Sequence, residues 1–485
     1  MTLPTSTPNH HRPPSTEAAW RPALWGLLFV LAGNMLIDAL EVSVAIVALP
    51  AVGDDLGLPV AERHWVVTGF AVGFGALMLF GTRVVALLGR RRVYLAALFV
   101  FAAASLAAAF ADSLVPLVAT RLVKGFCAAL TAPTGLAIIA ATFPEGRARS
   151  RAVSVYTLFG AGGFSAGLLL SGPLTEESWR WTFAFPAPVA LALFLCGLRL
   201  IPHDTPAEDQ PRGYDAAGAV TLSGGTLFLV YAITSVPTAG WHHARTLAAF
   251  AAAAALLVLF VRIELTVAHP LTRLELLAHR PLLRSALGAA ALNGSYLGLL
   301  LLSTVRLQQT EGWSPLRTAL AFLPAAAPLA LTALHSGRVV ARFGPARLIA
   351  LGAVFPPLGY LWCLRWGTPV SYTTDVLPTM LLVGAGFALS FTALHIQATS
   401  AVPADRLAAV GGLYQSAVQM GAVLTLALVA AVQPAGHRPA VLLVTAVGVL
   451  GLLVALTGVL PPTTDTPFRR RHDRRHLPRH PEGMG

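Results

Sequence analysis

Long apolar runs separated by short polar segments fill the chain from about residue 23 to residue 461. A bilayer core about 30 Å thick needs roughly 20 apolar residues of helix. Lipid offers no hydrogen-bond partner to open backbone groups, so runs of this length must be helices. Fourteen runs qualify: residues 23–50, 64–88, 93–111, 113–142, 152–173, 180–201, 216–236, 245–266, 285–307, 315–337, 345–367, 372–400, 407–432 and 438–461. The pattern predicts an all-α integral membrane protein with 14 transmembrane helices.

The composition agrees with this pattern. Of the 485 residues, 55% are hydrophobic and only 12% are charged, with a mean hydropathy of +0.68. Soluble domains carry about 25% charged residues, so a soluble protein is excluded. The formal net charge is +12, but the basic residues lie in loops and tails and form no basic face. We therefore expect no nucleic-acid partner.

Two residue types exclude further classes of function. Lys124 is the only lysine, and it follows Val123, whereas a P-loop needs lysine directly after glycine. We therefore expect no ATP hydrolysis by this chain. Cys127, Cys196 and Cys363 lie far apart in apolar runs, so we expect neither a disulfide nor a metal, and no cofactor.

The distribution of arginine predicts the orientation. With the N-terminus inside and the spans alternating, 24 arginines fall on the cytoplasmic side and seven outside. This bias follows the positive-inside rule and predicts a multi-pass cell-membrane protein with both termini cytoplasmic. The first 22 residues are polar and proline-rich, without the order of a cleaved signal peptide.

A short sequence repeat divides the chain into halves. The segments 83–92 and 338–347 share the pattern R-V-V-A-x-x-G-x-x-R at an offset of 255 residues, each at a cytoplasmic corner. Two six-span halves separated by two inserted spans give a 6+2+6 arrangement, with a binding site between the halves. The predicted parts are an N-terminal tail 1–22, the first half 23–201, a loop 202–215, the inserted spans 216–266, a loop 267–284, the second half 285–461 and a basic tail 462–485.

Charged residues inside predicted spans are costly and are candidates for function. Asp38 and Glu41 are three residues apart on the first span, and Arg121 and Lys124 are three apart on the fourth. A rise of about 1.5 Å per residue places Glu41 and Arg121 roughly 12–13 Å below the outer boundary, and Asp38 and Lys124 roughly 17–18 Å below it. We therefore predict a Glu41–Arg121 pair and an Asp38–Lys124 pair.

These four residues have two interpretations. In the functional one, Glu41 carries the coupled proton, Arg121 gates it, and Asp38 and Lys124 take part. In the other, they are a permanent ionic link between two helices. Further polar residues are expected to line the substrate cavity, although glutamine is also a common interhelical hydrogen-bonding residue. These are Tyr296, Arg306, Gln308, Gln309, Gln415 and Gln419.

Five ordered motifs carry a resemblance to a known family. Residues 40–50 resemble L-D-x-T-x-x-N-V-A-L-P, residues 64–68 resemble Q-W-V-x-T, and residues 121–125 resemble R-x-x-Q-G. Residues 178–181 read S-W-R-W, and residues 307–316 are similar to L-Q-Q…G-x-S-P-L. The chain thus resembles the major facilitator superfamily in its fourteen-helix drug:proton antiporter branch. The resemblance implies the major facilitator fold.

Two motifs of that branch are altered. The loop that gates the inside carries Thr82, Arg83, Gly89, Arg90 and Arg91, but Ala86 stands where the family has aspartate. The helix-5 motif associated with antiport keeps Gly163, Gly167 and Gly172, but Leu168 stands at its proline position. These glycines still predict close helix approach.

The resemblance implies a secondary exporter of amphipathic small molecules such as drugs, antibiotics or secondary metabolites. Inward proton flow would drive it by alternating access. One alternative is a narrow-specificity metabolite carrier of the same fold. A membrane enzyme acting on lipid-linked substrates is disfavoured, because the longest internal polar loop, 202–215, has no metal-like spacing. We expect a transporter whose partners are a small molecule, protons and the bilayer, without an obligatory protein partner.

Overall fold

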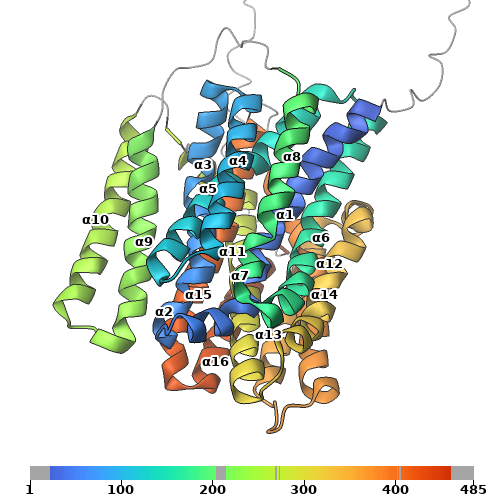
Figure 1. Cartoon of the computed structure of the whole chain (residues 1–485). Coiled ribbons are helices and arrows are strands. Elements are labelled where there is room, and N and C mark those ends of the chain that lie inside the picture. Colours follow the sequence, from blue (N-terminus) through green and yellow to red (C-terminus); the bar gives the residue numbers. More distant parts are fainter. Residues whose placement is uncertain are drawn as a thin grey trace, which may run out of the picture.

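The computed structural model describes residues 22–203, 215–267, 270–271, 274–400, 402 and 406–459. The predicted tails apart from Pro22, and most of the 202–215 loop, lie outside these ranges. The regular elements of the described residues are all helices (Figure 1).

The helices follow the predicted order of six spans, two inserted spans and six spans. The first half contains α1 (Pro22–Asp55), α2 (Val60–Arg63), α3 (Trp65–Leu88), α4 (Arg90–Ala109), α5 (Leu114–Thr142), α6 (Arg147–Glu177), α7 (Trp179–Ala184) and α8 (Pro186–Leu200). The inserted pair is α9 (Ala216–Ala239) and α10 (Ala244–Thr266). The second half contains η1 (Leu274–Ala278), α11 (Arg280–Val305), η2 (Arg306–Thr310), α12 (Pro315–Phe343), α13 (Pro345–Cys363), η3 (Tyr372–Val376), α14 (Leu377–Thr399), α15 (Leu407–Val432), η5 (Gln433–Ala435) and α16 (His437–Leu456).

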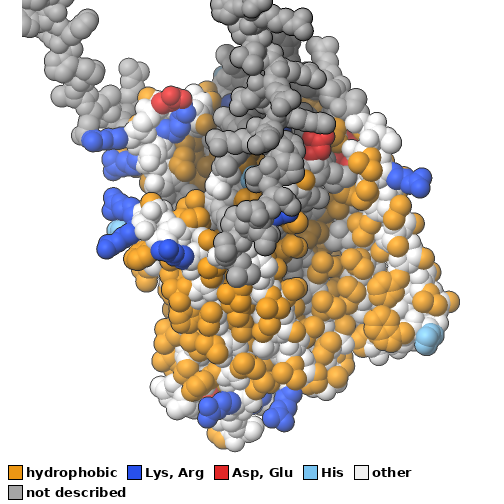
Figure 2. All heavy atoms as spheres, turned by 180° about the vertical axis from the view of Figure 1, so that it is seen from behind, with side chains coloured by type: hydrophobic (Ala, Val, Ile, Leu, Met, Phe, Trp, Pro, Cys, Tyr) orange, Lys and Arg blue, Asp and Glu red, His pale blue; other side chains and the backbone are white. Residues whose placement is uncertain are grey.

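These helices confirm the predicted spans. Thirteen helical segments among the described residues are long and apolar enough to cross a bilayer, counting α7 with α8 as one. The remaining predicted span coincides with α3, a helix of 24 residues. Hydrophobic side chains cover a broad middle band of the surface, with charged side chains gathered at its two ends (Figure 2). A band of this kind is what a bilayer requires.

The two halves repeat one packing scheme, as the sequence repeat predicts. The pairs α1–α6, α3–α5 and α4–α8 recur as α11–α15, α12–α14 and α13–α16. The repeated motif forms the same corner in both halves: Gly89 has φ 90° and ψ 147°, and Gly344 has φ 81° and ψ 145°. A positive φ is unfavourable for residues with a Cβ, which explains why glycine stands at both corners.

The inserted helices lie outside both halves. α9 packs against α3 and α15, and α10 packs against α9. Figure 1 shows the pair as a hairpin on one flank of the bundle. The main contacts between the two halves are those of α6 with α12, α3 with α15 and α1 with α11.

The halves contact each other unevenly along the bundle. We call the end where α1 begins the near end and the end where α1 finishes the far end. At the far end α6 and α12 are in close contact, because a Cβ on Gly172 would lie 2.8 Å from the Cα of Leu316. Towards the near end, a Cβ on Gly162 or Gly337 would meet nothing within 4 Å, and no side chain of residues 331–339 is buried. Among the described residues, α6 and α12 are thus in close contact at the far end and lack such contact towards the near end.

Close backbone approach at Gly125 generates the first prediction. A Cβ at this position of α5 would collide with the carbonyl oxygen of Phe70 and lie 2.8 Å from the amide nitrogen of Phe74 on α3. We expect Gly125→Ala to destabilise the protein by about 1–3 kcal/mol. The measurement is the thermal unfolding midpoint in detergent. Gly162→Ala is the matched control and should leave the midpoint unchanged or raised, because alanine favours helix. Equal midpoints for the two variants would contradict the packing described.

Candidate functional site

A cluster of buried charges joins α1 to α5. Glu41 accepts a hydrogen bond from Nη1 of Arg121 on one carboxylate oxygen, and Nζ of Lys124 lies 2.5 Å from the other. The guanidinium also donates to the carbonyl of Glu41 at 2.9 Å and to that of Val66 on α3 at 2.9 Å. All three charged side chains have zero exposure. One carboxylate therefore contacts two cations, and Arg121 ties three helices together.

Asp38 lies one turn away and has different partners. Its Oδ2 accepts hydrogen bonds from Nδ2 of Asn34 at 2.9 Å and from Oγ1 of Thr131 at 2.8 Å. Its other oxygen, Oδ1, is buried and has no hydrogen-bond partner in the described part of the chain. The predicted Glu41–Arg121 pair is confirmed, but the predicted Asp38–Lys124 pair is wrong.

The direction of helical side chains accounts for the partners that Lys124 and Asp38 have instead. Side chains in a helix lean towards its N-terminus. The spans α1, α3, α4 and α5 alternate in direction, so α1 and α5 are antiparallel. Glu41 therefore leans towards the near end, whereas Lys124 leans towards the far end, and the two meet. The same lean carries Asp38 away from Lys124 and towards Thr131. The depth estimate compared Cα positions only and missed this effect.

Aromatic rings surround the two cations. The guanidinium carbon of Arg121 lies 5.0 Å from the centre of the Phe70 ring and 5.6 Å from that of Phe183. Nζ of Lys124 lies 5.0 Å from the centre of the Phe101 ring. Cation–π contacts of this kind are stronger when water is excluded. Two cations and two carboxyl groups thus share one apolar compartment, in which charge balance governs stability.

The helix-5 motif glycines hold α1 on its other side. A Cβ on Gly163 would collide with the carbonyl of Leu36, and one on Gly167 with the hydroxyl of Ser43. Ser43 in turn donates to the carbonyl of Phe164 at 2.8 Å. The predicted close helix approach is therefore confirmed for α1 and α6. It presses the charged face of α1 against α5.

A run of aromatic rings connects the two halves. Phe164 of α6 lies 5.6 Å from Tyr296 of α11 between ring centres, and Tyr296 lies 4.7 Å from Phe387 of α14. Phe387 lies 4.9 Å from Phe391, stacked at 16°. His395 follows four residues later on the same face of α14 and is exposed. We call Phe164, Tyr296, Phe387 and Phe391 the aromatic run. Sequence reasoning included Tyr296 but missed Phe387 and Phe391, although their spacing of four residues was a usable signal.

The other predicted cavity residues are scattered. Gln308 donates to the carbonyl of Val47 at 3.1 Å, which links α1 to η2 at the far end. Gln309 lines a small far-end pocket with Leu49 and His64. Arg306 donates to the carbonyls of Trp366 and Gly367 at 3.2 and 3.0 Å, within the second half. None of the three contacts the aromatic run.

Two further glutamines lie on α15. Gln415 is half-buried, whereas Gln419 is buried at the contact with α3, because a Cβ on Gly75 would lie 2.6 Å from its Cβ. Gln419 therefore contributes to the contact between the halves.

The gating-loop motif forms the α3–α4 corner. Thr82 and Arg83 lie in α3, but their side chains are outside the described part of the structure. Arg90 is exposed, as is Ala86 at the position of the missing aspartate. Arg91 donates to the carbonyls of Leu198 and Ile201 at 2.6 and 2.7 Å. The motif arginine Arg91 thus attaches α4 to the C-terminus of α8.

Polar contacts hold the far end together. The indole nitrogen of Trp179 donates to Asp55 at 2.9 Å, and Arg180 forms an ion pair with the same carboxylate at 2.6 Å. Glu176 of the first half accepts from the backbone nitrogen of Leu316 of the second at 3.3 Å. These contacts, with the one made by Gln308, agree with a far end at which the halves are joined. The described residues contain no group of three or more His, Cys, Asp or Glu side chains suited to a metal.

Comparison with known proteins identifies related chains. The family described as Major Facilitator Superfamily matches residues 31–426. The puromycin resistance protein pur8 of Streptomyces alboniger is 35% identical over 409 residues, covering 83% of this chain and 80% of that one. The lincomycin resistance protein of Streptomyces lincolnensis is 30% identical over 460 residues, covering 93% of each. The tetracenomycin C resistance and export protein of Streptomyces glaucescens is 28% identical over 426 residues, covering 86% and 78%.

Solved structures have the same fold. A D-xylose–proton symporter matches with a TM-score of 0.63 at 14% identity, covering 90% of this chain and 97% of that one. The peptide transporter PepTSo, of the POT family, matches with a TM-score of 0.64 at 15% identity, with the same coverage. At such low identity these likenesses concern the fold alone.

Charge balance in the buried cluster generates the second prediction. Glu41→Gln leaves Arg121 and Lys124 without their shared carboxylate, and breaking a buried pair costs about 3–5 kcal/mol. We expect its thermal unfolding midpoint in detergent to fall sharply. The double variant Glu41→Gln/Lys124→Gln should recover part of the loss, because one uncompensated cation is removed.

The matched control is Glu145→Gln, which breaks the exposed ion pair of Glu145 with Arg149. We expect a change of at most about 1 kcal/mol. If the double variant is less stable than Glu41→Gln alone, charge balance does not govern this cluster.

Proposed function

The chain belongs to the major facilitator superfamily and is an exporter in the cell membrane, and we propose that it expels antibiotic-like amphipathic molecules in exchange for protons. It acts as a transporter and carries out no enzymatic reaction. Relatives named for puromycin, lincomycin and tetracenomycin C support an antibiotic as the cargo. Three named antibiotics among the relatives favour an antibiotic-like molecule over a metabolite as the cargo. Asp38 is the main support for proton coupling. Its carboxyl group is buried beside the charged cluster, and its Oδ1 has no hydrogen-bond partner among the described residues.

The aromatic run provides a surface for a flat apolar group. Phe164 and Phe391 are half-buried, so part of each ring faces away from its helix neighbours. The run crosses from α6 to α14, and the halves separate towards the near end. Small-molecule sites are mostly apolar with a few polar groups. A ligand entering from the near end therefore meets aromatic rings from both halves at once, with His395 as the polar group on its path.

The near end faces the cytoplasm in this proposal. It includes the corners at Gly89 and Gly344, around which the arginines cluster, and the 24-to-7 bias supports this orientation. The conformation with separated halves at the near end is then open to the cytoplasm. It is the state that loads cargo in an exporter.

Asp38 is the group that carries the exchanged proton, which it releases to the cytoplasm before cargo loads in this state. Both oxygens of Glu41 contact cations, so adding a proton there would break one of the two contacts. At Asp38 only Oδ2 is engaged, by two neutral donors, and Oδ1 is vacant. Protonating Oδ1 breaks no described contact. The sequence-based expectation placed the proton on Glu41, whereas the contacts described here support its neighbour Asp38. In this proposal Glu41, Arg121 and Lys124 set the local charge.

The coupling follows from charge balance. With Asp38 ionised, the formal charges of Asp38, Glu41, Arg121 and Lys124 sum to zero. With Asp38 protonated, they sum to +1. In an apolar compartment an excess charge is costly unless the surroundings change. Protonation thus favours movement of α1 relative to α5, and α1 also contacts α6 and α11. The charge state of the cluster in this way biases the packing of the two halves.

The decisive experiment measures transport by reconstituted protein. Asp38→Asn removes the titratable group and leaves the side-chain shape unchanged. We expect it to abolish substrate transport driven by a pH gradient, while exchange of substrate for substrate, which needs no net proton movement, continues. Puromycin, lincomycin, tetracenomycin C and a cationic dye form the substrate panel, assayed with and without a protonophore.

A control variant and the comparison with Glu41→Gln allow the result to be interpreted. Asp112→Asn, which changes an exposed carboxylate at the far end, is the control and should transport like the wild type. If Asp38→Asn keeps gradient-driven transport and a folded Glu41→Gln loses it, the proton is on Glu41 and our assignment to Asp38 is wrong. If neither variant affects coupling, the cluster is a permanent ionic link. Transport of one compound only would favour the narrow-specificity carrier.

The aromatic run generates a separate prediction. Stacking contributes about 0.5–1.5 kcal/mol beyond area burial, so Phe391→Ala should weaken substrate binding by about tenfold. Binding to purified protein is measured by fluorescence titration. Phe99→Ala, a 53% exposed residue of α4 that packs on Phe194, is the control and should bind like the wild type. Equal affinities for Phe391→Ala and the wild type would place the substrate elsewhere.

A further inference from the structure

Asp38 has four polar neighbours for which the second half has no polar counterpart. Asn34 and Thr131 donate to its Oδ2, and the hydroxyls of Tyr94 and Tyr156 interact electrostatically with its carboxyl group. In chain order, the repeat offset of 255 residues relates the four neighbours to Ala289, Ile349, Gly386 and Gly411. The fold therefore does not need polar side chains at these places. They occur in the half that carries the buried carboxyl group.

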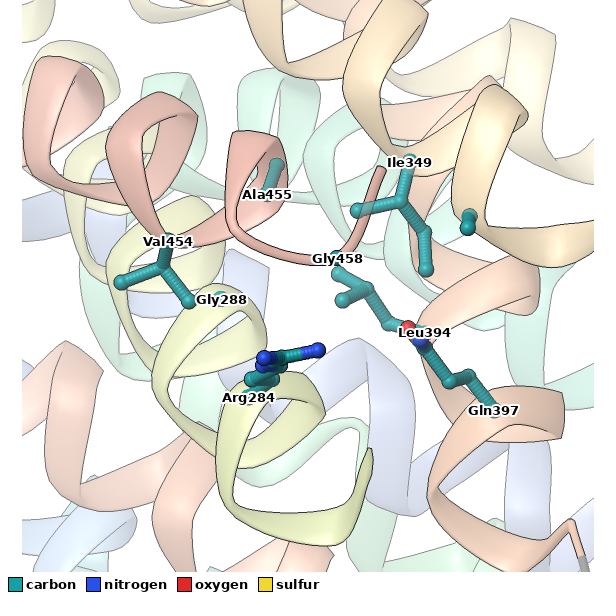
Figure 3. A pocket seen from close by; sticks show the side chains of 9 residues that line it. Arg284, Gly288, Ile349, Leu394, Gln397, Val454, Ala455 and Gly458 are labelled. Atoms are coloured by element: carbon teal, nitrogen blue, oxygen red, sulfur yellow. The ribbon is translucent and has the colours of Figure 1, made fainter. Parts of the chain in front are cut away.

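The second half has an apolar residue where the first half has Tyr94. Ile349 stands at this position, is buried, and lines a small pocket with Gly288 and Leu394 (Figure 3). Asn293 stands at the position of Asp38 and is neutral. Of the two halves, the one with a carboxyl group at this place is therefore the one with a tyrosine hydroxyl beside it.

Tyr94 itself is fully buried. It lies in the second turn of α4, which begins at the near end, and its side chain has no exposed surface. Its hydroxyl lies beside Asn34 and near Asp38, but it has no hydrogen-bond partner among the described residues. A buried hydroxyl without an acceptor is unfavourable. An aromatic ring without the hydroxyl would fill the same space at no such cost, so packing alone does not account for a tyrosine here.

The hydroxyl of Tyr94 is complementary to the unpaired oxygen of Asp38. Oδ1 of Asp38 is a buried acceptor to which no described group donates. The other neighbours are already engaged, because Asn34 and Thr131 donate to Oδ2 and Tyr156 donates to a backbone carbonyl of α5 at 2.8 Å. A phenol O–H donates and a carboxylate oxygen accepts. Tyr94 is therefore the neighbour whose proton is available to Oδ1.

We propose that Tyr94 is a positioning residue for the proton carrier, and that its hydroxyl donates to Oδ1 of Asp38 when this carboxylate is ionised. The inference rests on the proposed role of Asp38 and names the residue that sets its affinity for the proton. Rotation of the carboxyl group turns Oδ1 towards the hydroxyl. When Asp38 takes up a proton on Oδ1, the charged acceptor is lost and this hydrogen bond weakens.

The hydrogen bond has a direct consequence for coupling. A donor to an ionised carboxylate favours the ionised form. Tyr94 therefore helps Asp38 to release its proton to the cytoplasm before cargo loads. The other ionisable groups around Asp38 come from α1, α5 and α6 and stay unchanged when Tyr94 is replaced: Glu41, Arg121, Lys124, Cys127 and Tyr156.

Infrared titration of the purified full chain in detergent tests the inference without measuring transport. The pH-dependent carboxyl band that Asp38→Asn removes belongs to Asp38. We expect Tyr94→Phe to move the midpoint of this band about one pH unit higher, a tenfold change in proton affinity, because the ionised form loses a hydrogen bond. Transport driven by a pH gradient should shift to a higher cytoplasmic pH in the same variant, because the proton must leave before cargo loads.

Two other tyrosines provide controls. Tyr360→Phe changes a fully buried tyrosine of α13, the helix that corresponds to α4, whose hydroxyl donates to Ser295 at 2.9 Å. Tyr156→Phe removes a hydroxyl that already has an acceptor. Both variants should keep the wild-type midpoint.

The outcomes separate this inference from the proposed function. An unchanged midpoint in Tyr94→Phe, or an equal shift in Tyr156→Phe or Tyr360→Phe, would overturn the role of Tyr94 and leave Asp38 as the proton carrier. If Asp38→Asn removes no band, Asp38 does not titrate. The proposed function then loses its proton carrier, and the role of Tyr94 is overturned with it.

Discussion

The contact of Glu41 with Arg121 and Lys124 is the interaction on which the first half depends. Three charges lie with no exposed surface inside an apolar bundle, and each would be prohibitively costly alone. Their mutual contact requires α1 and α5 to keep one relative height, and the hydrogen bond from Arg121 to Val66 brings α3 into the same arrangement. Glycines of α6 then press α1 into place from the opposite side. A change of charge in this cluster therefore acts on four helices together.

The pseudo-symmetry of the fold shows how two similar halves come to differ in role. The repeat offset of 255 residues relates Asp38 and Glu41 of α1 to Asn293 and Tyr296 of α11. The carboxyl groups of one half correspond to a neutral amide and an aromatic ring in the other. Asn293 donates to the carbonyl of Val418, and Tyr296 joins the aromatic run. The first half thus holds the buried charged cluster of Asp38, Glu41, Arg121 and Lys124. The second half contributes three of the four rings of the aromatic run.

The positions of small residues and polar contacts explain why the two halves touch at the far end and not towards the near end. Gly172 allows α6 and α12 to touch at the far end, and Glu176 and Gln308 each bond across the halves there. Towards the near end, Gly162 and Gly337 face no neighbour. The altered gating motif is consistent with this difference, because Ala86, in place of an aspartate, has no charge with which to hold the near end closed.

The sequence by itself determined the number of spans, the 6+2+6 order, the equivalent corners and the four buried charged residues. These depend on local properties: the length of apolar runs, glycine at positive φ, and the cost of a charge in a span. Only the tertiary structure decided which charges pair, because pairing depends on the direction in which long side chains lean and on the height at which two helices pack. Lys124 therefore contacts Glu41, and Asp38 contacts Thr131. The aromatic run was likewise beyond the sequence, since its residues come from helices distant along the chain.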